Sequence, residues 1–225
     1  MRLRITFSKS GSLRYTGHLD LHTIWERTIR RAGLPLMYTQ GFHPGPKIQL
    51  ASALPLGFIG RAEIVDLWLE DIPAPGDKCS NDLNRYYTQT IQPAAPPGLT
   101  ILSVEPVEEP SPALQTQVIS AEYEVTLLEP PDVSALPDLP QRLATLLASA
   151  SLPSQRRGKD YDLRPLIEGL SLLPPDAAGP HRLWMCLAAR ESATGRPEAV
   201  LEALGIPLES TRIERIRIIL KDGNK

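Results

Sequence analysis

Hydrophobic residues alternate with polar ones at the start of the chain and then change their period. In residues 2–8 every second residue is apolar, which is the pattern of a half-buried strand. From residue 19 to residue 32 the apolar side chains recur three and four positions apart, which predicts an amphipathic helix. Gly33 and Pro35 follow as stop signals, so the helix should end there.

The first half of the chain gives six predicted elements in this way. After the helix, the run GFHPGPK at residues 41–47 predicts a shaped loop, because two prolines and two glycines exclude regular structure. Strands are predicted at residues 48–55 and 62–70, a helix at 78–91 and a strand at 99–107. The order strand, helix, strand, strand, helix, strand is that of a ferredoxin-like fold.

The pattern recurs in the second half of the chain. Its elements are a strand at 121–128, a helix at 139–150, weak strands at 155–161 and 166–173, a strand at 182–189, a helix at 197–204 and a strand at 212–220. We therefore predict an α+β protein of two tandem ferredoxin-like (βαββαβ) units, each an antiparallel sheet with helices on one face. The units are residues 1–108, which carry the basic motif region, and a divergent unit at 119–225, joined by a polar, Pro-containing linker at 109–118.

Charge is distributed unevenly along the chain. The formal net charge is −2 over 225 residues, but residues 1–50 hold eight Lys or Arg against two acidic residues, a net of +6. The remaining residues hold 16 basic and 24 acidic side chains, a net of −8. A basic segment of this kind favours a polyanion as partner, although it would also serve to dock one half of the chain on the other.

Composition excludes several classes of protein. Hydrophobic residues make up 42% and the apolar runs are too short to span a bilayer, so we expect a soluble protein with no membrane partner. The N-terminus alternates polar and apolar residues where a secretory signal would need a continuous apolar run. Cys79 and Cys186 stand far apart without CxxC spacing, which argues against a disulfide framework, a structural zinc site and an iron–sulfur cluster. We expect a cytoplasmic protein with no cofactor in this chain.

Polar and aromatic groups accompany the basic residues of the first segment. Arg27, Arg30 and Arg31 lie on the helix face opposite the apolar stripe, where they can fork onto phosphate oxygens or simply complement the helix dipole. Phe42, in the Gly/Pro loop, is placed either to stack on a base or to fold back onto the core. The predicted nucleic-acid or anion site comprises Lys9, Arg14, His18, Asp20, Arg27, Arg30, Arg31, Gln40, Phe42, His43 and Lys47.

His18 and Asp20 stand at the predicted start of the helix. Thr16 or Asp20 could cap the free amides there, and a helix N-terminus that follows a glycine also attracts anions. His18 is the one candidate for a general acid or base, but the sequence identifies no nucleophile or acid to pair with it. His18 and His22 could share a metal ion with His43 or Asp20, yet no HExxH motif is present, and we predict no native metal site.

Several runs of the sequence resemble a known family. They are FSKSGSLRYTGHLDL at residues 7–21, ERTIRRAGLP at 26–35, YTQGFHPGPKI at 38–48, DLRPLI at 162–167 and GRPEAVLEALG at 195–205. These runs are similar to the radical SAM-linked (radical SAM-associated) protein family, a domain of unknown function, and the likeness covers nearly the whole chain. In that family the domain occurs alone or fused to the C-terminus of a cobalamin-binding radical SAM protein, often encoded near ribonuclease G and ribosomal proteins.

The resemblance implies an accessory role beside a radical SAM enzyme, with an RNA or a ribosome-related substrate to present. It supplies no catalytic residue. Gly17 stands where the family commonly has serine, which removes a possible helix cap, and His22 falls outside the pattern, which weakens the metal interpretation. The family's characteristic positions fall on Lys9, Gly11, Arg14, His18, Leu19, Asp20, Arg27, Arg30, Arg31, Gln40, Gly41, Phe42, Pro44, Pro46 and Lys47.

The prediction is therefore a non-catalytic accessory module that binds RNA, or another polyanion, and acts with a radical SAM protein. Two alternatives stay open. One is a metal-independent RNase or RNA-modifying enzyme that uses His18 as acid or base. The other is a pure protein adaptor, whose basic face docks on an acidic patch of the radical SAM partner.

Overall fold

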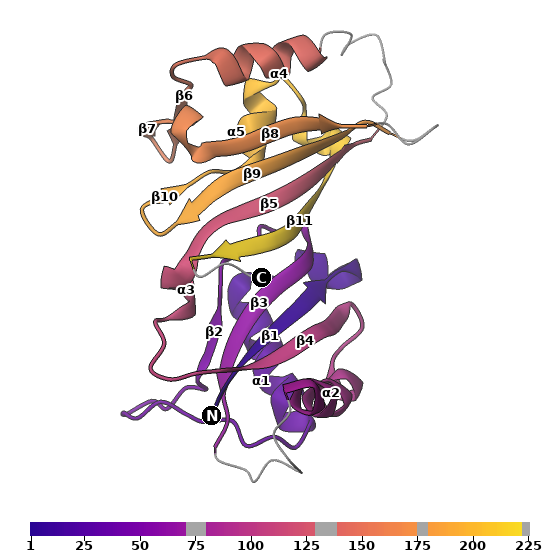
Figure 1. Ribbon diagram of the computed structural model, residues 1–225, viewed down its shortest axis with the longest axis vertical. Coiled ribbons are helices and arrows are strands. Elements are labelled where there is room, and N and C mark those ends of the chain that lie inside the picture. Colours follow the sequence, from indigo (N-terminus) through magenta and orange to yellow (C-terminus); the bar gives the residue numbers. More distant parts are fainter. Residues whose placement is uncertain (71–79, 129–138, 175–179, 222–225) are drawn as a thin grey trace. The chain divides into compact units, whose positions relative to one another are not determined.

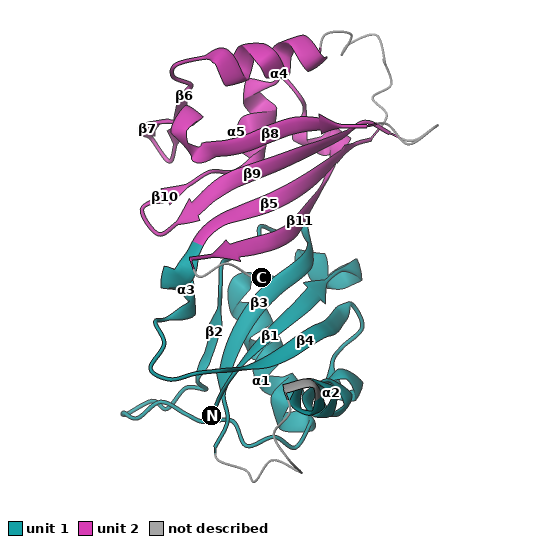
Figure 2. Ribbon diagram, in the orientation of Figure 1, with its two compact units in different colours: residues 1–118 teal, residues 119–225 magenta. Residues whose placement is uncertain are grey.

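A computed structural model of the chain describes residues 1–70, 80–128, 139–174 and 180–221 (Figure 1). The chain divides into two compact units, Met1–Val118 and Ile119–Lys225 (Figure 2). Both units combine antiparallel strand pairs with helices, so the protein is of the α+β class. Cys79 and the predicted start of the helix at residue 78 lie outside the described residues.

The first unit follows the predicted order of elements. Its main strands are β1 (Arg2–Lys9), β2 (Ile48–Leu50), β3 (Ile59–Trp68) and β4 (Leu99–Val107); its helices are α1 (His18–Arg31), α2 (Ser80–Ile91) and the short α3 (Leu114–Gln117), and η1 (Gly11–Tyr15) and η2 (Gln92–Ala94) are 3-10 turns. β3 pairs with β2 and with β1, and β1 pairs with β4, all antiparallel. The strand order is therefore β2-β3-β1-β4.

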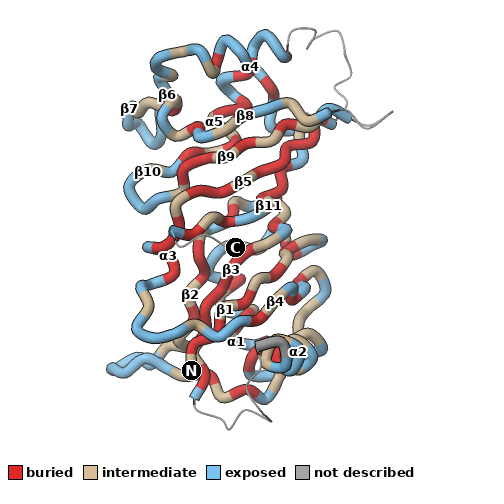
Figure 3. Tube along the Cα trace, in the orientation of Figure 1, coloured by how far each residue is buried: buried red, intermediate tan, exposed pale blue. Residues whose placement is uncertain are grey.

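The alternation of β1 buries one face of this sheet beneath α1 and α2. Leu3, Ile5 and Phe7 are fully buried and belong to one core cluster with side chains from both helices. Phe7 meets Trp25 of α1 edge to face, with the ring centroids 4.9 Å apart. Figure 3 shows the buried positions concentrated along the strands.

Residues 109–117, which the sequence predicts as part of a linker, pack on the polar face of the same sheet, and we call them the strap. The Arg2 guanidinium donates to the Ser111 carbonyl at 3.1 Å and to the next carbonyl of the strap at 2.9 Å. The Arg4 guanidinium donates to the side-chain oxygen of Gln117 at 3.2 Å. The strap thus satisfies donors that would otherwise face solvent from β1.

The second unit also keeps the predicted order, with one change. Its elements are β5 (Val118–Leu127), α4 (Leu139–Ala148), β6 (Pro153–Arg156), β7 (Lys159–Asp162), η4 (Arg164–Leu166), β8 (Ile167–Leu173), β9 (Arg182–Arg190), β10 (Ala193–Thr194), α5 (Pro197–Ala203), η5 (Leu208–Ser210) and β11 (Thr211–Leu220). Strands β8, β9, β5 and β11 are neighbours in that order, and β10 pairs with the end of β9. Helices α4 and α5 lie on one side of this sheet (Figure 1).

The change concerns residues 155–161: the prediction of a single weak strand there is wrong. That stretch is a hairpin, because β6 and β7 pair only with each other in a two-stranded sheet. The chain reverses at Arg157 and Gly158, whose φ angles are +50° and +76°. A type I′ reversal of this kind is usually announced by Asn-Gly or Asp-Gly, so the Arg-Gly pair gave no turn signal in the sequence.

Helix α1 begins without a side-chain cap. Gly17 occupies the N-cap position and has no side chain to offer. The Thr16 hydroxyl, which the sequence offered as a cap, instead donates to the Leu13 carbonyl at 2.7 Å. The first amides of α1 therefore depend on other partners, as expected for a helix with glycine at its N-cap position.

Candidate nucleic-acid interface

Helix α1 presents three arginines on its outer face. Its apolar stripe is buried, whereas Arg27, Arg30 and Arg31 are exposed and line a hollow of about 390 Å³, which we call the arginine hollow. The Arg31 side chain donates to the Arg27 carbonyl at 3.3 Å, and the Arg30 guanidinium lies 4.0 Å from the Glu26 carboxylate. Because the Arg30 side chain is 68% exposed, water screens that ion pair and the guanidinium stays accessible.

The Gly/Pro loop is fixed beside the arginine hollow at its base. The Tyr38 hydroxyl donates to Glu26 at 3.3 Å, so the loop and Arg30 approach the same carboxylate. The Thr39 amide donates to the Gly45 carbonyl at 2.8 Å, and the Thr39 hydroxyl accepts the Gly45 amide at 3.0 Å. The Thr39–Gly45 bonds close the loop on itself, and the Tyr38 bond connects the segment before the loop to α1.

The tip of the loop is open to solvent. Phe42 is completely exposed, at 102% of its reference area, and Gln40 and His43 are exposed beside it. Gly41 has φ +145°, a conformation that glycine adopts far more readily than other residues. The structure thus excludes the alternative in which Phe42 folds back onto the core, and it leaves the ring free to stack on a planar ligand.

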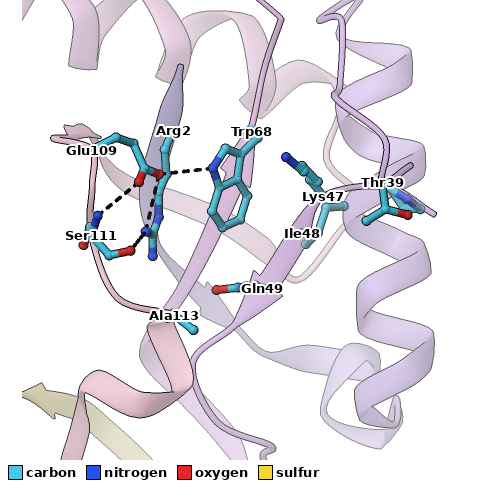
Figure 4. Close-up of a pocket in the computed structure, with 10 residues that line it drawn as sticks. Arg2, Thr39, Lys47, Ile48, Gln49, Trp68, Glu109, Ser111 and Ala113 are labelled. Atoms are coloured by element: carbon cyan, nitrogen blue, oxygen red, sulfur yellow. Dashed lines mark hydrogen bonds and ion pairs between the residues drawn. The ribbon is translucent and has the colours of Figure 1, made fainter. Parts of the chain in front are cut away.

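Lys47 ends the loop and lines a second hollow, of about 380 Å³, which we call the Trp68 pocket (Figure 4). The Lys47 carbonyl accepts the Trp68 amide at 3.1 Å, so these two residues are cross-strand neighbours. Thr39 and Gln49 line the pocket next to them. Among the residues that the structure describes, none forms an ion pair with the Lys47 ammonium.

Arg2 fixes the opposite wall of the Trp68 pocket. Its guanidinium lies 4.7 Å from the centroid of the Trp68 ring and 3.5 Å from the Glu109 carboxylate, to which the Trp68 indole donates at 3.2 Å. The amide of Ser111, and after it the indole and the guanidinium, hold the pKa of Glu109 below its ordinary value. Glu109 is therefore an anion that already lies beside Arg2 and the Trp68 indole, whereas the Lys47 ammonium has no acidic partner among the described residues.

Arg2 is itself held by a buried carboxylate. Asp66 accepts hydrogen bonds from Arg2 at 2.7 and 2.9 Å and from Arg4 at 2.9 Å, and its side chain is fully buried. One carboxylate thus orients two guanidinium groups on the polar face of the sheet.

A comparison with models of protein families identifies the family of this chain. A family model described as "Uncharacterized protein conserved in bacteria (DUF2344)" matches residues 2–197, from the start of β1 to the first residue of α5. The chain belongs to this family. Both units therefore contribute to the DUF2344 region. A search of curated proteins gave no match.

The DUF2344 chain does not bring all the predicted site residues together. His18 and Asp20, which we call the far group, lie in the first turn of α1, whereas Arg31 ends the helix. The usual rise per residue of an α-helix puts His18 and Arg31 about 20 Å apart. Arg14 belongs to the far group, where its guanidinium stacks on the Tyr15 ring at 4.6 Å. Most of the remaining predicted residues lie in the last turns of α1 and in the loop that follows it, and we call them the near group: Arg27, Arg30, Arg31, Gln40, Phe42, His43 and Lys47.

Lys9 belongs to neither group. It is 1% exposed, and its ammonium donates to the Thr16 carbonyl at 2.9 Å. An ammonium group buried in this way stabilises the junction between β1 and α1 and does not face an external ligand.

Of the residues that line the Trp68 pocket, the sequence predicted Lys47 as a site residue but not Arg2, Trp68 or Glu109. A signal existed, since the alternation of residues 62–70 places Asp66 and Trp68 together on one face, but their partners Arg2 and Glu109 are distant in sequence. No group of three or more metal-ligating side chains occurs within the described residues. In the same part of the chain, no helix is long and apolar enough to cross a membrane.

Proposed function

We propose that this protein is a non-catalytic module that binds single-stranded RNA for a radical SAM enzyme, in the cytoplasm and without a cofactor of its own. The observation that carries the proposal is the arginine hollow on α1, fixed through Glu26 to a loop whose Phe42 ring is completely exposed. Cations and exposed aromatic rings are the two kinds of group with which proteins hold an RNA strand without a defined sequence, and here they lie on α1 and on the loop that follows it.

Each part of the near group has a role in this proposal. Arg27, Arg30 and Arg31 contact successive phosphates, because guanidinium groups offer paired donors to phosphate oxygens. Phe42 stacks on a base, and Lys47 neutralises a further phosphate at the mouth of the Trp68 pocket. Gln40 and His43 flank Phe42 and offer hydrogen-bonding groups to base edges.

The radical SAM partner rests on the resemblance of the motifs at residues 7–21, 26–35 and 38–48. The non-catalytic role rests on distance. His18, the candidate acid or base, lies at the opposite end of α1 from Arg31, so the residues proposed to hold the strand are separate on the helix from the candidate acid or base.

We also propose that each unit is a ferredoxin-like fold. The sheet orders β2-β3-β1-β4 and β8-β9-β5-β11 support this, since each places the first strand of its unit between the third and the fourth. Such sheets bind nucleic acid in many unrelated proteins, so the fold is compatible with the proposal without arguing for it.

Anisotropy of a labelled oligoribonucleotide, about 12 residues long to cover one binding surface, tests the arginine hollow. In the full chain, Arg30→Glu with Arg31→Glu should weaken binding about tenfold or more and lower the slope of log K against log salt by about 1.4. Arg85→Glu with Lys221→Glu reverses the same amount of charge at exposed positions elsewhere and should leave the affinity within about twofold. Unchanged binding by the Arg30/Arg31 variant would mean that the surface is wrongly assigned.

Phe42→Ala separates stacking from charge. Because the ring is completely exposed, its loss should leave the melting temperature unchanged and weaken RNA binding by about 1–3 kcal/mol. RNA cleavage that disappears in His18→Ala would replace the proposal by the enzyme alternative. A radical SAM protein retained on the purified chain in the absence of RNA would replace it by the adaptor.

A further inference from the structure

The β6–β7 hairpin of the second unit concentrates positive charge at its tip. Arg156, Arg157 and Lys159 are all exposed and stand within four consecutive residues. In the described parts of the chain, no side chain forms a hydrogen bond or an ion pair with any of the three. The tip therefore carries three cations that have no side-chain partner among the described residues.

These residue types work against the hairpin that carries them. Arg157 has φ +50°, a left-handed conformation that disfavours residues with a β-carbon and in which asparagine is tolerated best. Arg156 and Lys159 face each other directly across the two strands, and like charges in that position repel. Asparagine and threonine would build the same turn at lower cost, so turn formation does not account for the cations.

The base of the hairpin is held firmly. Asp162 accepts the amides of Leu152 and Arg164 at 2.8 and 2.9 Å, and these bonds lower the pKa of its carboxyl group. The Arg164 guanidinium donates to the Leu147 carbonyl, near the end of α4, at 3.0 Å. The cationic tip is thus presented on a supported element.

A pocket of about 540 Å³ lies between the hairpin and the turn from β9 to β10. Ser192, Thr194 and Tyr161 line it together with the three basic residues; the Thr194 hydroxyl donates to the Arg190 carbonyl at 3.0 Å, which leaves Ser192 and Tyr161 as the hydroxyl donors of the site. Asp160 and Asp162 also line it, but one oxygen of each is engaged inside the hairpin or at its base, that of Asp160 by the Gln155 amide at 2.9 Å. Clustered cations and hydroxyl donors are the groups that recognise phosphate oxygens.

We propose that this hairpin pocket binds phosphate groups, either those of a free nucleoside triphosphate or those of an RNA strand. The site lies in the second unit and depends neither on the arginine hollow nor on the function proposed above. It adds a second anion site to a segment whose overall charge is negative, which is why the charge distribution of the sequence did not reveal it.

The test uses a variant that should strengthen the hairpin while it removes charge. Arg157→Asn with Lys159→Thr gives an Asn-Gly turn and removes the like-charged pair, so the full chain should keep or raise its melting temperature. The same variant should bind the phosphate-bearing probe about tenfold more weakly; with the oligoribonucleotide as probe, the salt slope should also fall by about 1.4 for two lost contacts. Arg85→Asn with Lys221→Thr is the matched control and should change neither.

Two probes, ATP and an oligoribonucleotide of about 12 residues, distinguish the sources of phosphate. ATP binding that falls in the hairpin variant identifies a nucleotide site. Oligonucleotide binding that falls in the variant, with no ATP binding, identifies an RNA contact. The proposal is overturned if the wild-type chain binds neither probe, or if the variant binds both as the control does. Since the arginine hollow is tested by a separate variant, either proposal can fail alone.

Discussion

Asp66→Asn is the substitution that most directly tests how the first unit is held together. The side chain is fully buried, and its two oxygens accept from Arg2 and Arg4 at 2.7–2.9 Å. Asparagine keeps the size of the side chain but removes the negative charge, and it turns an amide donor toward two guanidinium groups that are donors themselves.

The expected cost follows from the burial of the two arginines. The Arg2 side chain is 1% exposed and that of Arg4 is 18% exposed, so Arg2 in particular would remain as a buried cation. Removing one partner of a buried ion pair costs about 3–5 kcal/mol. Arg2 keeps Glu109 at 3.5 Å and two strap carbonyls, which places the expected loss in the lower part of that range, about 3 kcal/mol.

Urea unfolding of the full chain, followed by circular dichroism, measures this loss. Arg30→Ala is a suitable control, since it breaks an ion pair with Glu26 in which the arginine is 68% exposed and the carboxylate 25% exposed, and it should cost no more than about 1 kcal/mol. Asp66→Leu with Arg2→Met should cost less than Asp66→Asn, because it removes both members of the buried pair and leaves only Arg4, which is 18% exposed, without its carboxylate. The reasoning fails if Asp66→Asn costs as little as the control.

Two further predictions concern other positions. Gly98→Ala should lower the free energy of unfolding by about 2–4 kcal/mol, because Gly98 has φ +90° and an added β-carbon would clash with the Ser10 carbonyl oxygen. Gly33→Ala is the control: Gly33 has φ +70° but no atom within 4 Å of the added β-carbon, so this variant should lose only about 1 kcal/mol. Thermal unfolding measures both losses. Burial first, and Glu168 next, raise the pKa of the Cys186 thiol from 9.0 to about 11. The reaction of this thiol with a disulfide reagent should therefore be slow at pH 8 and accelerate as the pH rises through 11. Glu168→Gln should increase the reaction rate at pH 8. The stability that this shift contributes is present below pH 9.0 and is lost as the pH rises through about 11; a thiol that reacts at pH 8 as fast as in the unfolded chain would contradict the burial.

Local periodicity was enough to predict most elements of the fold. The alternation of β1 and the apolar stripe of α1 depend on neighbours within a few residues, and both elements lie within one residue of their predicted bounds. The same alternation also indicates that Lys9 is buried, because residue 9 falls on the face of Leu3, Ile5 and Phe7. A preference for charged residues on the surface hid that signal.

Long-range pairing accounts for what the sequence did not show. The Trp68 pocket needs the register of β1 against β3 and the return of the strap, which brings Glu109 to Trp68 from 41 residues away. The division of the predicted site into two groups follows from the length of α1, which the predicted helix at residues 19–32 already implied. Whether the near group binds RNA stays a prediction until it is measured.

The strap decides where the first unit can be cut. A fragment that ends at residue 108 would lose the carbonyl acceptors of Arg2 and the Gln117 oxygen that Arg4 contacts, and would expose two guanidinium groups with a single carboxylate between them. A fragment that ends at residue 118 retains every one of these partners. The strap was predicted as part of a linker, but it belongs to the fold of the first unit. It must therefore be kept when the first unit is expressed alone or fused to another protein.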